Sequence, residues 1–307
     1  MVQATSPGPV ARCTGGGLAT VDVHNPHLVF APYNGDVLLQ SSDAVLFGVH
    51  SCVLALASPV FRDMLSTSSL ASPSQSPAGS FFIRKPIALS EPAHILEYLL
   101  CLIYPLPPPS FDNLSFLTLV VEASIKYKLS SVTNTLRRHL LSPLFLHRHP
   151  LRVFAIARRF DFLGEASEAS RASLDVDMFS VPISEELRYI SAYDYHGLLT
   201  LHYSRSQATR DLLSSRSKDC PLRCVQCSYD DSGGYELPPR WWLVFEKRAK
   251  QELRRRPLTD IIFSMQFLSK CANAGCPSCG TSILNSFEFM ECLKAEMDAL
   301  PDAISFV

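Results

Sequence analysis

Cysteines at metal-ligand spacing are the strongest chemical signal in the sequence. They form two clusters, Cys220-x₃-Cys224-x₂-Cys227 and Cys271-x₄-Cys276-x₂-Cys279. A tetrahedral zinc ion takes four soft thiolate ligands, and two C-x₂-C pairs supply that number. The spacing therefore predicts a structural zinc site, with no open coordination position, formed by Cys224, Cys227, Cys276 and Cys279. Because the 48 residues between the two pairs exceed the usual zinc-ribbon spacing, buried thiols without a metal and disulfides stay open as alternatives.

The second of these pairs also has the form of a redox motif. Cys276-Pro277-Ser278-Cys279 is a C-x-x-C sequence leading into a helical pattern. A thioredoxin-like enzyme requires a strand–helix–strand context, whereas the surrounding pattern is helical. The sequence contains no phosphate-binding loop, no G-x-S-x-G and no H-E-x-x-H. We therefore predict that the protein is not an enzyme and has no catalytic residues, with a thiol redox enzyme using Cys276 and Cys279 as the alternative.

A basic stretch, residues 240–256, carries seven basic residues against two acidic ones. Stripes of this kind contact nucleic acid or an acidic partner in some proteins. Here the apolar residues recur at helical spacing, so we expect the stretch to be an amphipathic helix with a solvated basic face and a core face of Trp241, Trp242, Val244 and Phe245. The net charge is −1, which provides no bulk attraction to nucleic acid. Nucleic acid is therefore not an expected partner.

The composition is that of a globular protein of a reducing compartment. Of the 307 residues, 47% are hydrophobic and 19% are charged, a balance that favours a folded core over disorder. The N-terminal residues lack the pattern of a signal peptide, and the longest apolar run, 94–106, is too short to span a bilayer. Together with ten cysteines, these features predict an intracellular protein of the cytoplasm, the nucleus or both, with no membrane partner.

Hydrophobic periodicity predicts an α+β fold, with a few short strands followed by helices. The segments 36–40 and 45–49 flank a turn and indicate a β-hairpin, and Ile87 and Leu89 indicate a third strand. In the segments that follow, apolar residues recur at helical spacing. Pro92 suits the first turn of the first of these predicted helices. Later helices are predicted at 150–160, 163–173, 184–214, 240–256, 258–271 and 282–299.

Residues 36–65, DVLLQSSDAVLFGVHSCVLALASPVFRDML, contain an ordered series of motifs. An Asp-Val strand and a turn precede a strand that ends in Phe-x-x-His, and Ser-Pro-x-Phe then leads into a second helix. Ser58 and Pro59 form a favourable N-cap and first-turn pair for that helix. The expected buried set is Phe47, Val53, Leu54 and Phe61. The segment closely resembles the BTB/POZ signature, and the resemblance implies folding and interaction roles for Asp36, Phe47, His50, Val53, Leu54, Ser58 and Phe61.

The resemblance covers about residues 32–142, including the helix pair around 122–129. Residues 150–174 then resemble a BACK-type helical extension, and the combination with a cysteine-bearing tail is similar to a group of fungal BTB proteins. We therefore expect four regions: a flexible leader (1–30), a BTB/POZ domain (31–143), a BACK-like helical region (144–216) and a Cys-containing helical region (217–307).

This resemblance implies a protein–protein interaction module that assembles as a homodimer through apolar surface on the first helices. The helices that follow would present a surface to an unknown protein partner. One form of this function is a ubiquitin-ligase substrate adaptor bound to a cullin scaffold, and the alternative is a transcription or chromatin co-regulator. The hydrophobic-x-Glu motif that cullin-binding BTB adaptors commonly carry does not follow the third helix here, and Ser51 occupies the position after the motif histidine where the family has a basic residue.

Overall fold

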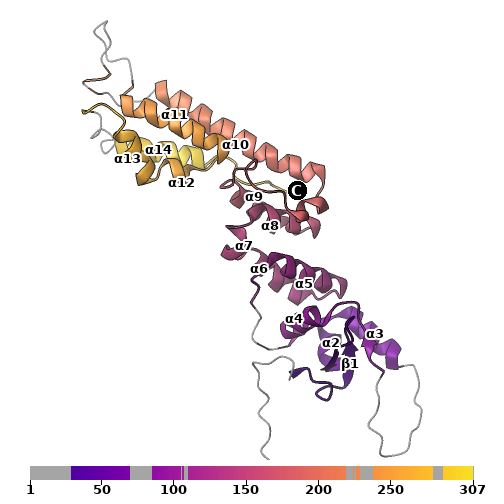
Figure 1. Ribbon diagram of the computed structural model, residues 1–307. Helices are drawn as coiled ribbons and strands as arrows, with labels where there is room; N and C mark the ends of the chain where they lie inside the picture. The colour runs from indigo at the N-terminus through magenta and orange to yellow at the C-terminus, as the bar shows by residue number, and fades with distance from the viewer. Residues whose placement is uncertain are drawn as a thin grey trace, which may run out of the picture. The chain divides into compact units, whose positions relative to one another are not determined.

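The computed structural model (Figure 1) describes residues 29–69, 85–104, 106, 110–218, 224, 226–228, 238–278 and 286–306. The chain divides into two compact units, Met1–Thr133 and Asn134–Val307. The expected leader lies almost entirely outside the described residues, as does Cys279. The four expected regions stay predictions.

A small mixed sheet forms the centre of the first unit. Its strands are β1 (Val37–Gln40), β2 (Leu46–Val49) and β3 (Ile87–Ala88), in the order β2-β1-β3. β1 pairs antiparallel with β2 and parallel with β3. The predicted hairpin is therefore confirmed. The third strand ends at Ala88, one residue before the predicted Leu89, although the Leu89 N–H still donates to the β1 carbonyl of Gln40 at 2.8 Å.

The hairpin depends on local turn chemistry and on one close backbone approach. The Ser41 hydroxyl accepts a 2.9 Å hydrogen bond from the Val45 N–H across the turn, and Ala44 adopts a φ of 65°. In β2, a Cβ atom on Gly48 would lie 2.3 Å from the carbonyl oxygen of Ala31. Only glycine permits that approach, so Gly48 lets the preceding segment pack directly on the sheet.

Helices α2 (Ser51–Ala57), α3 (Pro59–Ser69), α4 (Ala93–Ile103) and α5 (Leu114–Lys126) complete the first unit. The apolar spacing of α4 and α5 buries their inner faces, which accounts for most of the core. Pro92 is the N-cap of α4, one position before the predicted first turn. The buried side chains of these two helices are Ile95, Leu96, Leu99, Leu100, Leu117, Val120 and Val121.

Helix α6 (Ser130–Leu140) crosses the division between the units. The second unit then consists of α7 (Pro143–Leu146), α8 (Pro150–Arg159), α9 (Leu163–Ser173), the 3₁₀ helix η1 (Glu185–Tyr189), α10 (Ala192–Lys218), α11 (Arg240–Arg255), α12 (Thr259–Ile262), α13 (Met265–Ala272) and α14 (Phe287–Asp298). In the ranges that the structure describes, no helix is both long and apolar enough to cross a membrane.

Two long helices predicted for the second unit are interrupted by serine caps. The predicted helix 184–214 is η1 followed by α10, because the Ser191 hydroxyl accepts from the Asp194 N–H at 3.0 Å and starts a new helix. The predicted helix 258–271 is α12 followed by α13, and the Ser264 hydroxyl accepts from the Phe267 N–H at 3.2 Å. A serine side chain satisfies free N–H groups at a helix start, and thereby fixes a boundary that apolar spacing alone does not reveal.

The core of the second unit is built on the apolar face of α11. Trp241, Trp242 and Phe245 are fully buried, and the two indole rings meet edge to face at 5.9 Å. Val244 packs against this core and is only partly buried. Arg248 is among the basic residues that face solvent. The predicted division of this helix into a core face and a solvated basic face is therefore confirmed.

Arg205 of α10 joins the end of α14 to the rest of the second unit. Its guanidinium group is buried and donates to the carbonyl groups of Pro257 at 3.0 Å, Leu300 at 2.5 Å, Pro301 at 3.0 Å and Met297 at 3.3 Å. These four carbonyls come from a helix end and from loops, where no helical N–H is available to them. One side chain thus satisfies several main-chain acceptors at once.

Candidate functional site

The motif aspartate of the first unit caps helix α2. One carboxylate oxygen of Asp36 accepts from the Ser51 N–H at 2.7 Å, and the other accepts from the Ser51 hydroxyl at 2.5 Å. A carboxylate at a helix N-terminus satisfies free N–H groups and interacts favourably with the helix dipole. Ser51, the residue that departs from the family pattern, therefore makes a specific contact with Asp36.

His50 lies at the junction of β2 and α2, as the sequence predicted. Its N–H donates to the Tyr104 hydroxyl at 2.8 Å, and its ring Nδ1 lies 3.3 Å from the same oxygen. Burial raises the pKa of Tyr104, so the phenol stays protonated and available for hydrogen bonding. His50 is exposed, and its contacts connect the start of α2 to the end of α4.

Ser58 and Phe61 connect the start of α3 to the end of α5. The Ser58 hydroxyl accepts from the Phe61 N–H at 3.0 Å, which is the predicted N-cap contact, and donates to the Tyr127 carbonyl at 2.6 Å. The Phe61 and Tyr127 rings stack with centroids 4.8 Å apart. The Ser-Pro-x-Phe motif thus makes a tertiary contact as well as a helix cap.

Glu91 contacts Tyr127, the residue whose ring stacks on Phe61, and the sequence alone did not identify this contact. Its carboxylate accepts from the Tyr127 hydroxyl and forms a 2.5 Å ion pair with Lys126. Burial acts to raise the pKa of Glu91, but the hydrogen bonds from Lys126 and Tyr127 outweigh it and lower the pKa. The adjacent Lys126 and Tyr127 could have indicated a carboxylate partner, because two neighbouring donors that are partly buried require an acceptor.

The motif helix α2 has one buried face and one uncovered face. Phe47, Leu54 and Phe61 are buried, as expected. Val53 is only half-buried, contrary to the expected set, because consecutive helical residues point about 100° apart and Leu54 takes the core direction. On the outer side, Leu56 is 85% exposed. The motif residues therefore hold in place a short helix that presents an apolar side chain to solvent.

In the second unit, three of the four predicted zinc ligands come together. The Sγ atoms of Cys224, Cys227 and Cys276 all lie within 4.8 Å of one another, and those of Cys224 and Cys276 are 3.6 Å apart. A tetrahedral ion with Zn–S bonds of about 2.3 Å separates its sulfur ligands by roughly 3.8 Å, whereas a disulfide requires about 2.05 Å. The spacing fits a shared metal ion. Cys279 lies outside the described residues.

The main chain around these cysteines supplies donors to sulfur. The Gln226 N–H donates to Cys224 Sγ at 3.4 Å, and the Arg240 N–H donates to Cys227 Sγ at 3.3 Å. Such N–H groups stabilise the negative charge of a thiolate, the form that binds a metal. The Ser278 hydroxyl donates to the Gln226 side chain at 2.7 Å and connects the two arms of the cluster.

Neither His202 nor Cys271 belongs to this cluster. His202 Nε2 lies 3.0 Å from the Ser173 hydroxyl in a buried position. Cys271 is fully buried in the core, and burial raises its pKa. The redox alternative required strands around Cys276, and within the described part of residues 134–307 the elements are all helical. Outside the cluster, the described cysteines Cys52, Cys101, Cys271 and Cys292 form no disulfide.

The sheet β2-β1-β3 with its paired helices defines a small α+β interaction domain. Residues 33–142 match the family model of the BTB/POZ domain, so the chain contains a BTB/POZ domain over that range. BTB/POZ domains are non-enzymatic modules that mediate self-association and binding to other proteins. No curated protein matches the sequence of this chain.

Proposed function

We propose that the protein is a self-associating interaction module whose BTB/POZ domain forms a homodimer through helix α2. The exposed Leu56 carries this proposal. Full burial of a leucine side chain stabilises an interface by about 2 kcal/mol, and a two-fold axis would bury this residue on both copies. Asp36, His50 and Ser58 support the interface indirectly, because their hydrogen bonds hold α2 and α3 in place.

The experiment that tests this proposal is the molar mass of the full chain in solution. Size-exclusion chromatography with light scattering distinguishes a monomer of 34.0 kDa from a species of twice that mass. A dimer supports the proposal, and a monomer at concentrations of tens of micromolar contradicts it.

The second half of the proposal is that the helical unit binds a different protein and that the module works in the cytoplasm or the nucleus. As an adaptor it would join that protein to a cullin, and as a co-regulator it would join it to chromatin proteins. Affinity purification of the tagged full chain separates the two. Stoichiometric cullin supports the adaptor, whereas chromatin proteins without cullin, together with nuclear accumulation, support the co-regulator.

We also propose a structural zinc ion bound by Cys224, Cys227, Cys276 and Cys279. The 3.6 Å sulfur–sulfur distance and the main-chain donors to sulfur support this assignment. A bound zinc ion supplies a cross-link between the segment before α11 and the segment after α13, and structural zinc contributes on the order of 10 kcal/mol of apparent free energy. Four protein ligands leave no position for a substrate, so the site has no catalytic task in this proposal.

A further inference from the structure

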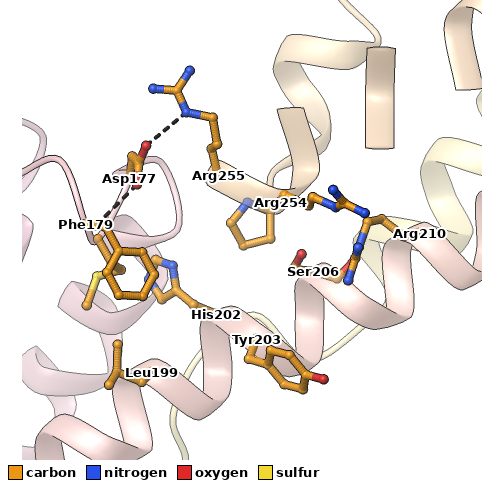
Figure 2. Close-up of a pocket in the computed structure, with 11 residues that line it drawn as sticks. Asp177, Phe179, Leu199, His202, Tyr203, Ser206, Arg210, Arg254 and Arg255 are labelled. Atoms are coloured by element: carbon orange, nitrogen blue, oxygen red, sulfur yellow. Dashed lines mark hydrogen bonds and ion pairs between the residues drawn. The ribbon is translucent and has the colours of Figure 1, made fainter. Parts of the chain in front are cut away.

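A cleft with a volume of about 450 Å³ lies in the second unit between three segments. One wall is a face of α10, another is the C-terminal end of α11, and the third is the segment that follows α9 (Figure 2). The α10 wall includes Leu199, Tyr203 and Arg210, whose spacing of four and seven residues places them along one side of that helix.

Two arginines at one end of the cleft have no carboxylate partner among the residues that the structure describes. Arg210 bonds only to neutral groups, the Ser206 carbonyl at 3.1 Å and the Gln207 side-chain oxygen at 2.7 Å. Arg254 makes no hydrogen bond or ion pair with any residue that the structure describes. The side chains of Arg210 and Arg254 extend toward one another from neighbouring helices (Figure 2).

Several other arginines of the same unit have a carboxylate partner. Arg255, on the opposite side of the cleft, forms a 2.9 Å ion pair with Asp177 and lowers the pKa of that carboxyl. Arg158 pairs with Asp194 at 2.8 Å. Two neighbouring guanidinium groups with free donors form a site for an anionic group, because charge-assisted bonds to a carboxylate are strong and often bidentate.

The other end of the cleft is apolar. Phe179 is 93% exposed although it lies beside the half-buried Leu199. His202 forms part of the floor, and burial lowers its pKa to about 4, so this ring is neutral at physiological pH. Phe179 therefore offers an uncovered aromatic ring beside Leu199 at this end of the cleft.

We propose that this cleft binds an acidic, apolar peptide segment of a protein partner. A carboxylate of the peptide would bind between Arg210 and Arg254, and an adjacent aliphatic or aromatic side chain would pack against Phe179 and Leu199. A small inorganic anion would use only the basic end and leave Phe179 uncovered, which favours a peptide that uses both ends. This proposal specifies the chemistry of the protein partner, and it rests on the proposed interaction function.

The test is a selection of random twelve-residue peptides displayed on phage against the full chain, run in parallel on the double variant Arg210→Glu/Arg254→Glu. We expect the wild type to select peptides with an acidic residue beside an apolar one. Synthetic versions of these peptides should bind the double variant about tenfold to a hundredfold more weakly, given the strength of hydrogen bonds between charged groups. The charge-matched control Arg148→Glu/Lys247→Glu, at two exposed positions outside the cleft, should bind like the wild type.

A second variant tests the apolar end. Phe179→Ser removes an exposed ring and leaves the core intact, so it should fold normally and weaken the peptides about tenfold. Any one of three results would overturn the proposal. The selected peptides could lack acidic residues, they could bind both double variants equally, or the protein could bind pyrophosphate and no acidic peptide. The molar mass of each sample is measured alongside. A monomeric wild type that still selects acidic peptides would refute self-association and leave the cleft assignment standing.

Discussion

The hydroxyl of Ser58 donates a 2.6 Å hydrogen bond to the backbone carbonyl of Tyr127, 69 residues further along the chain. The same hydroxyl accepts from the Phe61 N–H at 3.0 Å. One serine therefore caps α3 and satisfies a buried carbonyl at the end of α5. This hydrogen bond joins α3, which directly follows the proposed interaction helix α2, to the end of α5.

Ser58→Ala should destabilise the first unit by about 1–3 kcal/mol, since it removes the cap and leaves a buried carbonyl without its donor. Hydrogen exchange of the amides in α3 and α5 measures the loss as faster exchange. The matched control is Ser66→Ala, because the Ser66 hydroxyl donates only to a neighbouring carbonyl on the exposed side of α3. Equal exchange in the two variants would show that the Ser58–Tyr127 bond has no special importance.

Purified protein should contain one zinc ion per chain, and chelation should destabilise the second unit. Tryptophan fluorescence reports on that unit alone, because the two tryptophans are Trp241 and Trp242. We expect the urea midpoint of the fluorescence transition to fall on chelation, since zinc binding free energy contributes to folding.

Substitutions separate the metal from a simple loss of packing. Cys224→Ser should abolish stoichiometric zinc and lower the same midpoint, whereas Cys292→Ser, at an exposed cysteine, should change neither. Substoichiometric zinc together with an unchanged midpoint on chelation would favour unligated thiols at the cluster.

The second unit should lose stability as the pH falls from about 6.5 to about 4. Burial lowers the pKa of His202 from 6.5 to about 4, so in that window the unfolded chain binds a proton that the folded chain does not. Well above pH 6.5 the ring is neutral in both states and contributes no pH dependence. The loss at the acid end is about 3 kcal/mol for a difference of this size, measured by urea unfolding with tryptophan fluorescence.

His202→Gln provides the control for this pH dependence. The glutamine amide retains a donor that can reach Ser173 but does not titrate. The carboxyls with lowered pKa in this unit, such as Asp194 and Asp298, contribute mainly below about pH 5. Burial also lowers the pKa of His139, so the variant should lose part of the wild-type slope. A variant that loses stability between pH 6.5 and 4.5 as steeply as the wild type would refute the assignment to His202.

Arg205→Lys should destabilise the second unit by about 2–4 kcal/mol, because a lysine lacks the fork that serves four carbonyls and leaves some of them unsatisfied. The midpoint of the tryptophan fluorescence transition in urea measures the effect. Arg148→Lys, at an exposed position, should have no effect. If both substitutions are neutral, the end of α14 is held by its apolar contacts alone.

The parts of the fold that were predictable depend on local chemistry. The hairpin around Ser41, the cap at Ser58 and the apolar face around Trp242 each follow from a few neighbouring residues. The helix breaks at Ser191 and Ser264 were missed, because serine is common within polar segments and only its hydrogen bond to the main chain shows that it is a cap.

The candidate sites were also predictable only where neighbouring residues determine them. The C-x₂-C spacing predicts a pair of thiols, but that Cys276 lies 3.6 Å from Cys224 depends on how α11 and α13 pack, which spacing does not encode. Glu91 and Arg254 were missed for the same reason. The partners of Glu91 are about 35 residues away, and the cleft beside Arg254 is assembled from three separate segments.

Sedimentation equilibrium of Leu56→Asp against the wild type tests the proposed self-association most directly. A carboxylate in place of Leu56 would be buried without a partner in the dimer, so the dissociation constant should rise at least a hundredfold while the monomer stays folded. Ile183→Asp is the control, since Ile183 is 91% exposed and lies in the second unit. A dimeric wild type, a monomeric Leu56→Asp variant and a dimeric control are the predicted results. A Leu56→Asp variant that dimerises as tightly as the wild type would contradict the account.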